Sequence, residues 1–254
     1  MNNISLNVYN EKGTDVPIIC LHGFLETKEM WSNLHLFFSN HPIYCIDLPG
    51  HGQSSLNENT KCSLQTIGKM IMEALGQMKI TECYVLGHSM GGYVALALLE
   101  LFPEMVRKVI LLNSNYLADS ESKRSDRVRG IHILRKHPKL YFNQAFEPLF
   151  LEPEKHSEVI QQLMDRAQTT GTDGILYAIE AMMNRKDQSE LVKMNADKVF
   201  MIQGEMDTMF MSPPENQSTL PLKQWFKVFN SKHMSIFERE TETMLAIGEV
   251  IAID

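Results

Sequence analysis

The chain has 254 residues, of which 44% are hydrophobic and 22% charged, and its formal net charge is −7. This length suits one large domain or two small ones, and the composition is typical of a globular protein. The negative charge, with no basic stripe interleaved with aromatic residues, excludes nucleic acid as an expected partner. No basic segment precedes an apolar run at the N-terminus, and every apolar run is far shorter than a membrane span. We therefore expect neither a signal peptide nor membrane insertion.

The cysteine and histidine patterns indicate the cellular compartment and whether a metal or other cofactor is expected. None of the four cysteines forms a C-x-x-C pair, and three of them lie inside apolar runs, where a buried free thiol is the ordinary role. This usage fits a reducing compartment, and we predict a cytoplasmic protein. The histidines form no H-E-x-x-H pattern or similar metal-ligand spacing, so we predict no metal and no other cofactor.

The first half of the chain alternates short apolar runs with helical patterns. Residues 6–9 alternate in polarity and predict an edge strand, whereas wholly or largely apolar runs predict buried strands at 17–21, 43–46, 83–86 and 106–112. Helical spacing of apolar residues predicts helices between them, at 26–39, 63–78 and 93–99. This alternation is typical of an α/β fold, a mostly parallel sheet with helices on both faces.

The alternation stops after residue 115. No convincing strand follows until residue 198, and helical patterns occupy 127–136, 140–150, 153–168 and 172–185. We interpret 116–194 as a helical cap, or lid, inserted into a core made of 1–115 and 195–254. Strands are expected again at 198–204 and 224–229, and a helix at 240–251 closes the chain.

One serine stands between two glycines where the run at 83–86 ends. The sequence Gly87-His88-Ser89-Met90-Gly91 is followed by good helix formers, which predicts a strand, a sharp turn and a helix. Such a turn would force Ser89 toward positive φ and leave no room for a side chain at residues 87 and 91. This G-x-S-x-G pattern is that of a nucleophile elbow. The alternative is a glycine-rich turn with an ordinary solvated serine.

Polar residues follow several predicted strands, and the carboxyl ends of parallel strands share one edge of the sheet. His22-Gly23-Phe24, Asp47, Ser89, Asp207 and His233 stand at these ends. A serine hydroxyl needs a base such as histidine, and a carboxylate behind that base fixes its tautomer. The order serine, aspartate, histidine along the chain predicts a triad of Ser89, Asp207 and His233.

Other carboxylates could serve as the acid, and the attack also requires oxyanion donors. Alone, Asp207 would be a turn or capping residue and His233 a surface histidine; Glu205 is the rival acid, and Asp197 is a weaker one. The oxyanion that forms on serine attack needs two backbone N–H donors. We expect them from Met90, at the start of the elbow helix, and Phe24, after the first buried strand.

Together these motifs resemble the α/β-hydrolase superfamily, more narrowly its small lidded esterase-like branch. That branch includes carboxylesterases, cofactor-free haloperoxidases, carbon–carbon bond hydrolases, proline iminopeptidases and a menaquinone-pathway lyase. The resemblance covers the chain from about Pro17 onward and rests on residues 21–24, 47–54, 87–92 and 204–207. It implies nucleophile Ser89, acid Asp207, base His233 and oxyanion donors Phe24 and Met90. Family members often have glycine before the catalytic histidine, where this chain has Lys232.

The resulting hypothesis is a serine hydrolase that cleaves a small carboxylic ester, or a related acyl or carbon–carbon bond, through an acyl-enzyme. The serine at the elbow argues against haloalkane dehalogenase or epoxide hydrolase chemistry. Two alternatives stay open: base-driven elimination by the same residues, and a non-catalytic small-molecule receptor on the same fold. The cap offers apolar side chains that suggest an acyl or aryl partner, although each of them also suits the cap's own core: Tyr141, Phe142, Phe146, Phe150, Tyr177, Met182 and Met183.

Overall fold

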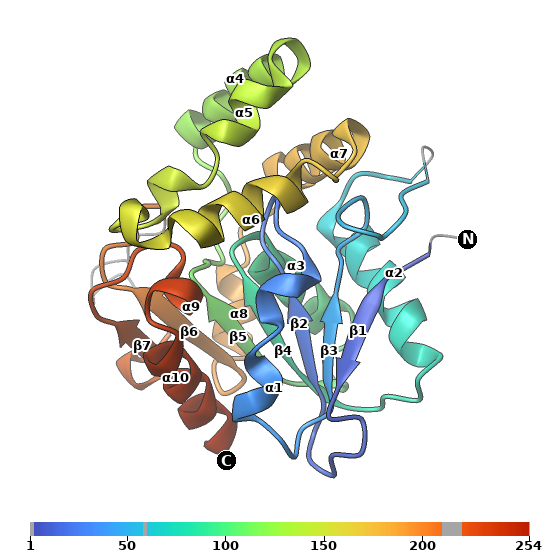
Figure 1. Cartoon of the computed structure of the whole chain (residues 1–254). Coiled ribbons are helices and arrows are strands. Elements are labelled where there is room, and N and C mark those ends of the chain that lie inside the picture. The colour runs from blue at the N-terminus through green and yellow to red at the C-terminus, as the bar shows by residue number, and fades with distance from the viewer. Residues whose placement is uncertain (1–2, 58–59, 210–219, 254) are drawn as a thin grey trace.

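The computed structural model describes residues 3–57, 60–209 and 220–253. Within them lies a seven-stranded sheet in the order β1-β3-β2-β4-β5-β6-β7 (Figure 1). β1 runs antiparallel to β3, and every other neighbouring pair is parallel. The predicted α/β fold class is therefore confirmed. The strands are β1 (Leu6–Tyr9), β2 (Ile18–Leu21), β3 (Ile43–Ile46), β4 (Cys83–His88), β5 (Val106–Leu112), β6 (Val199–Gly204) and β7 (Trp225–Val228).

Helices cover both faces of the sheet and one of its ends (Figure 1). The α-helices are α1 (Leu34–Phe37), α2 (Leu64–Gly76), α3 (Met90–Leu101), α4 (Glu121–Lys136), α5 (Pro138–Asn143), α6 (Ser157–Ala167), α7 (Thr172–Met183), α8 (Ser189–Met194), α9 (Ser235–Glu238) and α10 (Glu240–Ala252). Short 3₁₀ helices span Lys28–Trp31, Glu147–Leu149, Pro153–His156 and Leu222–Gln224.

The central strands are largely apolar because both of their faces are buried. In β2, Ile19 and Leu21 pack into a cluster with α2, α3 and α8, whereas Ile18 and Cys20 pack into a second cluster with α1 and α10. All of these side chains are fully buried, and each large one stabilises the fold by about 1.5–3 kcal/mol. The alternation of side chains along the strand therefore fixes which helix layer each residue contacts.

Two predicted helices are broken in the structure. The helix expected over 26–39 is only the 3₁₀ helix Lys28–Trp31 followed by α1, because Thr27 is extended (φ −139°, ψ 167°) and cannot continue a helix from Glu26. The helix expected over 140–150 ends with α5 at Asn143 and resumes as a 3₁₀ turn. Pro148 accounts for this, since in a continuous helix it would have no N–H to donate to the Gln144 carbonyl and its ring would collide with that carbonyl.

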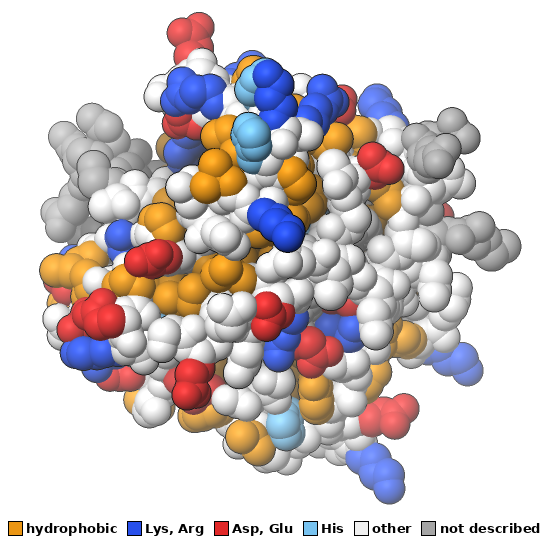
Figure 2. All heavy atoms as spheres, turned by 45° about the horizontal axis from the view of Figure 1, so that its top comes forward, with side chains coloured by type: hydrophobic (Ala, Val, Ile, Leu, Met, Phe, Trp, Pro, Cys, Tyr) orange, Lys and Arg blue, Asp and Glu red, His pale blue; other side chains and the backbone are white. Residues whose placement is uncertain are grey.

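Helices α4 to α8 lie between β5 and β6 in the sequence, and α4 to α7 gather over the end of the sheet where the parallel strands finish (Figure 1). They share a third hydrophobic cluster, which also includes Leu25 and Met234. With α4 and α5 turned toward the viewer, Figure 2 shows hydrophobic side chains among basic ones, and Val128, Ile133 and Leu140 are exposed on these helices. In the described residues, no helix is both long and apolar enough to span a membrane.

Candidate active site

Ser89 occupies a strained turn between β4 and α3. Its backbone has φ 49° and ψ −114°, a conformation that costs a non-glycine residue about 1–3 kcal/mol. A side chain at Gly87 would collide with the backbone of Gly91, and a side chain at Gly91 would collide with the carbonyl of Leu21. The turn is tied to the next strand, because the Ser89 N–H donates to the Leu112 carbonyl at 3.0 Å. The predicted strand, sharp turn and helix are therefore present.

Ser89, His233 and Asp207 lie in one line at the carboxyl edge of the sheet. The His233 Nε2 atom is 3.0 Å from Ser89 Oγ, and His233 Nδ1 is 2.8 Å from Asp207 Oδ2. An ionised carboxylate only accepts, so the neutral imidazole carries its proton on Nδ1 and presents a lone pair at Nε2 to the serine hydroxyl. Asp207 and His233 are both buried, which keeps water from competing for these contacts.

Asp207 is held as a carboxylate by the groups around it. Burial alone would raise the pKa of Asp207, but the positive charge available on His233 and several donors outweigh it and lower that pKa below its ordinary value. The donors are His233, the Asn113 side chain at 3.1 Å and the Met209 N–H at 2.9 Å. Asp207 is therefore set to accept the His233 Nδ1 proton at neutral pH.

The loop that carries His233 is fixed through its backbone. The His233 N–H donates to the Leu149 carbonyl at 3.0 Å. The Glu238 carboxylate accepts from the Lys232 N–H at 2.8 Å and from the Leu151 N–H at 2.6 Å. Lys232 thus fits the loop where family members often have glycine, and its ammonium group donates to the Pro148 carbonyl at 2.6 Å.

The two expected oxyanion donors belong to neighbouring segments, because the start of α3 packs against the end of β2. Met90 is the first residue of α3, and Phe24 follows β2 by three positions. Within the described part of the chain, neither backbone N–H donates to another protein group. His22 holds this loop as a neutral imidazole, since its Nε2 accepts from the Leu48 N–H at 2.9 Å while Nδ1 lies 2.7 Å from the Gly23 carbonyl.

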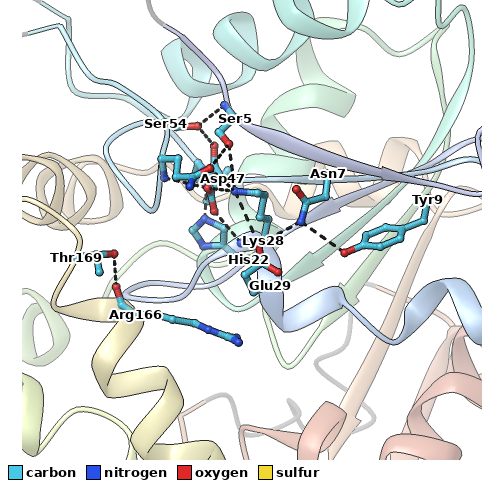
Figure 3. Close-up of polar contacts among 12 residues, drawn as sticks. Ser5, Asn7, Tyr9, His22, Lys28, Glu29, Asp47, Ser54, Arg166 and Thr169 are labelled. Atoms are coloured by element: carbon cyan, nitrogen blue, oxygen red, sulfur yellow. Dashed lines mark hydrogen bonds and ion pairs between the residues drawn. The ribbon is translucent and has the colours of Figure 1, made fainter.

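Asp47, also at a strand end, serves a different purpose. Its Oδ2 atom is 2.6 Å from the Lys28 ammonium group, and both side chains are buried. Figure 3 shows how this ion pair connects β3 to the N-terminal strand through Ser5, whose hydroxyl is 3.1 Å from Lys28 Nζ. The Ser54 hydroxyl donates to the Asp47 carbonyl at 2.6 Å. Asp47 therefore stabilises the loops beside the site and makes no contact with Ser89.

The rival acids lie elsewhere, whereas two residues of the site went unnoticed in the sequence. Glu205 and Asp197 are exposed. The unnoticed residues are Asn113 and Ser114, which directly follow β5: Ser114 Oγ donates to the Ser89 carbonyl at 2.7 Å. The strand-end criterion that selected Asp207 would have found both of them. Among the described residues, no three His, Cys, Asp or Glu side chains are grouped as a metal site would require.

An apolar pocket of about 290 Å³ opens beside Phe24, between its loop and helices α4 and α5. Of the aromatic residues expected to line a pocket, Tyr141 and Phe146 do so. Phe142 and Phe150 are instead packed in the third cluster, and Tyr177 is packed in the first. The pocket is lined by Phe24, Leu25, Ile133, Tyr141, Gln144, Ala145 and Phe146.

Comparisons with known proteins agree with this fold. A sequence model described as alpha/beta hydrolase fold matches residues 16–240. An uncharacterized hydrolase of Bacillus subtilis, YugF, is 30% identical over 120 residues, which are 46% of this chain and 44% of that protein. The chain spans about half the length of the curated relatives it matches.

Two solved structures show the same fold at low sequence identity. An esterase of Thermogutta terrifontis has a TM-score of 0.86 and 21% identity, over 98% of this chain and 93% of that one. An enol-lactonase of Burkholderia xenovorans LB400 has a TM-score of 0.83 and 17% identity, over 99% of this chain and 97% of that one.

Proposed function

The chain belongs to the α/β-hydrolase fold family, and from this premise we propose that it is a serine hydrolase that cleaves a small carboxylic ester or a related acyl or carbon–carbon bond. The observation that carries the proposal is the line of contacts from Ser89 Oγ through His233 to Asp207, at 3.0 Å and 2.8 Å. These are the distances that a nucleophile, its base and the carboxylate behind that base require.

In the proposed mechanism, Ser89 Oγ attacks the carbonyl carbon of the substrate while His233 Nε2 takes the hydroxyl proton. The backbone N–H groups of Phe24 and Met90 donate to the oxyanion that forms. As the tetrahedral intermediate collapses, His233 returns the proton to the leaving alcohol and an acyl-enzyme remains on Ser89. Water then attacks this ester with His233 again as the base, which releases the acid and restores the serine.

The apolar pocket supports the proposal that the substrate carries an acyl or aryl group of modest size. It adjoins Phe24, one of the two proposed oxyanion donors, and its walls are largely apolar. A group of several carbons fits a space of about 290 Å³. We assign helices α4 to α7, within the segment 116–194, to a cap over this end of the sheet, in which α4 and α5 border the pocket. All four cysteines are free thiols, which supports the proposed cytoplasmic location.

The test is turnover of short p-nitrophenyl esters, together with covalent labelling by a fluorophosphonate probe. The wild type is expected to show both, and Ser89→Ala is expected to show neither while it keeps the circular dichroism spectrum of the wild type. Ser32→Ala, at an exposed serine outside the site, is the matched control and should retain both. Equal turnover in Ser89→Ala would refute the proposal. Labelling without ester turnover would point to elimination chemistry, and ligand binding without either would point to a receptor.

A further inference from the structure

A buried pair of side chains behind the site is unused by this mechanism. His88 Nδ1 lies 2.9 Å from Glu26 Oε2, and the two side chains are 0% and 2% exposed. We propose that His88 and Glu26 form a charged positioning pair that holds the loops of Phe24, Ser89 and His233 in register for catalysis. This inference rests on the proposed function and assigns the pair no contact with the substrate.

The His88 ring faces an acceptor on each side. Its Nε2 atom lies 3.0 Å from the backbone carbonyl oxygen of His233, which can only accept a hydrogen bond, so Nε2 carries a proton. Its Nδ1 atom faces the Glu26 carboxylate, which also accepts the Gly23 N–H. An imidazolium beside a carboxylate satisfies all of these contacts at once.

The electrostatics of the pair agree with this assignment. Burial alone would lower the pKa of His88, but the charge of Glu26 and its hydrogen bond to the ring outweigh it and raise that pKa. Burial alone would raise the pKa of Glu26, and the facing charge and hydrogen bond of His88 lower it instead. Besides each other, the titratable groups near the pair are His22, Asp207 and His233, whose ring centroid lies 5.1 Å from that of His88.

The pair touches the backbone beside each proposed functional group. Glu26 binds Gly23, the residue before Phe24, and His88 is itself the residue before Ser89. His88 also binds the carbonyl of His233, which is the proposed base. The fit at the first of these points is close: a Cβ on Gly23 would lie 2.6 Å from Glu26 Oε2 and 2.9 Å from His88 Nδ1. One ion pair therefore joins three loops that are far apart in the sequence.

Stability alone does not explain such a pair. Desolvation of two charges offsets much of their attraction, and hydrophobic residues of similar volume are often as stabilising in a buried position. The pair instead fixes the position of particular backbone atoms. Glu26 accepts from the Gly23 N–H, and His88 donates to the His233 carbonyl. Because a displacement of about 1 Å at a catalytic group can cost about 100-fold in rate, this alignment matters for turnover.

Kinetics of Glu26→Gln, His88→Gln and the double variant test the role. We expect kcat for a p-nitrophenyl ester to fall about 10- to 100-fold with KM changed less than about 2-fold. The double variant should be no slower than the worse single variant, since both residues act as one unit. The control is Asp47→Asn, which breaks an equally buried ion pair with no contact to Ser89 or His233. It should lower Tm while kcat stays within about 2-fold.

The inference would be overturned if Glu26→Gln and His88→Gln lost no more kcat than Asp47→Asn at an equal loss of Tm.

Nitrogen NMR of the wild type gives a readout that needs neither turnover nor a folded variant. With His88 assigned, both of its ring nitrogens should show directly bonded protons at neutral pH. A ring with only one protonated nitrogen, in an enzyme that hydrolyses esters, would overturn the charged pair alone. A wild type without ester turnover or probe labelling would overturn the proposed function, and the positioning role with it.

Discussion

Asn113 and Asp207 are joined by a hydrogen bond of 3.1 Å between the amide Nδ2 and the carboxylate Oδ2, the same oxygen that accepts from His233. The Asn113 amide also donates to the Lys232 carbonyl at 3.0 Å. One buried side chain at the end of β5 therefore orients the proposed acid and the residue before the proposed base.

Replacement of Asn113 by glycine should isolate this contribution. Asn113 has φ 45°, which glycine adopts without strain, so Asn113→Gly removes the amide and leaves the backbone unstrained. We expect a loss of about 1–3 kcal/mol in the free energy of unfolding, because buried acceptors lose their donor. Ester turnover should fall as well. Urea denaturation and kcat measure the two effects, and a variant that loses neither would remove the role assigned to this amide.

The elbow should not accept a side chain at residue 91. A methyl group there meets the backbone carbonyls of Leu21 and His22, so Gly91→Ala must shift the start of α3. We expect a destabilisation of about 1–3 kcal/mol and loss of probe labelling at Ser89. Gly76→Ala is the matched control, because a Cβ at this α2 glycine meets nothing within 4 Å. It should leave Tm equal or slightly higher, and a similar loss in both variants would contradict the explanation.

The pocket beside Phe24 should set the preferred length of the acyl group. Ile133 lines it, whereas Val128, on the same helix, is 55% exposed and lies outside the lining. Ile133→Trp would fill part of the pocket and should raise KM for longer p-nitrophenyl esters while the acetate ester is little affected. Val128→Trp should show the wild-type chain-length profile. The same profile in both variants would place the acyl group elsewhere.

His51 should make the folded state sensitive to acid. Burial, together with the neighbouring His22 ring, lowers the pKa of His51 to about 3, whereas an unfolded histidine titrates near 6.5. Between about pH 3 and about pH 6.5, the His51 imidazole is protonated in the unfolded chain and neutral in the folded protein. Stability is therefore fully present above about pH 6.5 and falls on acidification, by about 1.4 kcal/mol per pH unit for this group.

His51→Phe provides the comparison, since it keeps a ring against Phe24, whose centroid is 6.3 Å from that of His51. Urea denaturation between pH 7 and pH 4 should give a shallower decline in this variant than in the wild type. His22 remains as a second buried histidine, so only the difference between the two slopes is diagnostic. Parallel slopes would show that folding does not lower the pKa of His51.

Elements that depend on local pattern were predictable from the sequence, and β3 and β5 have the expected bounds. Each is short and largely apolar, which is typical of a strand that is buried on both faces of a parallel sheet. The segment 26–39 was predicted wrongly because its apolar residues have helical spacing, whereas the structure uses Glu26 for contacts with Gly23 and His88. No local pattern shows that a glutamate binds a histidine 62 positions away.

The site was predictable to the extent that its chemistry requires particular residue types in a particular order. Ser89, Asp207 and His233 were found because each follows a strand, and the structure brings their side chains together. Asn113 directly follows β5, so the strand-end criterion could have found it. His88 could not be found in this way, since its contacts with Glu26 and His233 depend on burial and on pairings across the fold.

Leu25 and Met234 connect the helices above the sheet to the loops that carry the proposed functional residues. Each belongs to the hydrophobic cluster of α4 to α7, and each is the immediate neighbour of a proposed functional residue, Phe24 or His233. Movement of these helices away from the sheet would expose the Leu25 and Met234 side chains. It would also loosen the loops of Phe24 and His233. A movement of these helices would therefore disturb the alignment of both proposed functional residues at once.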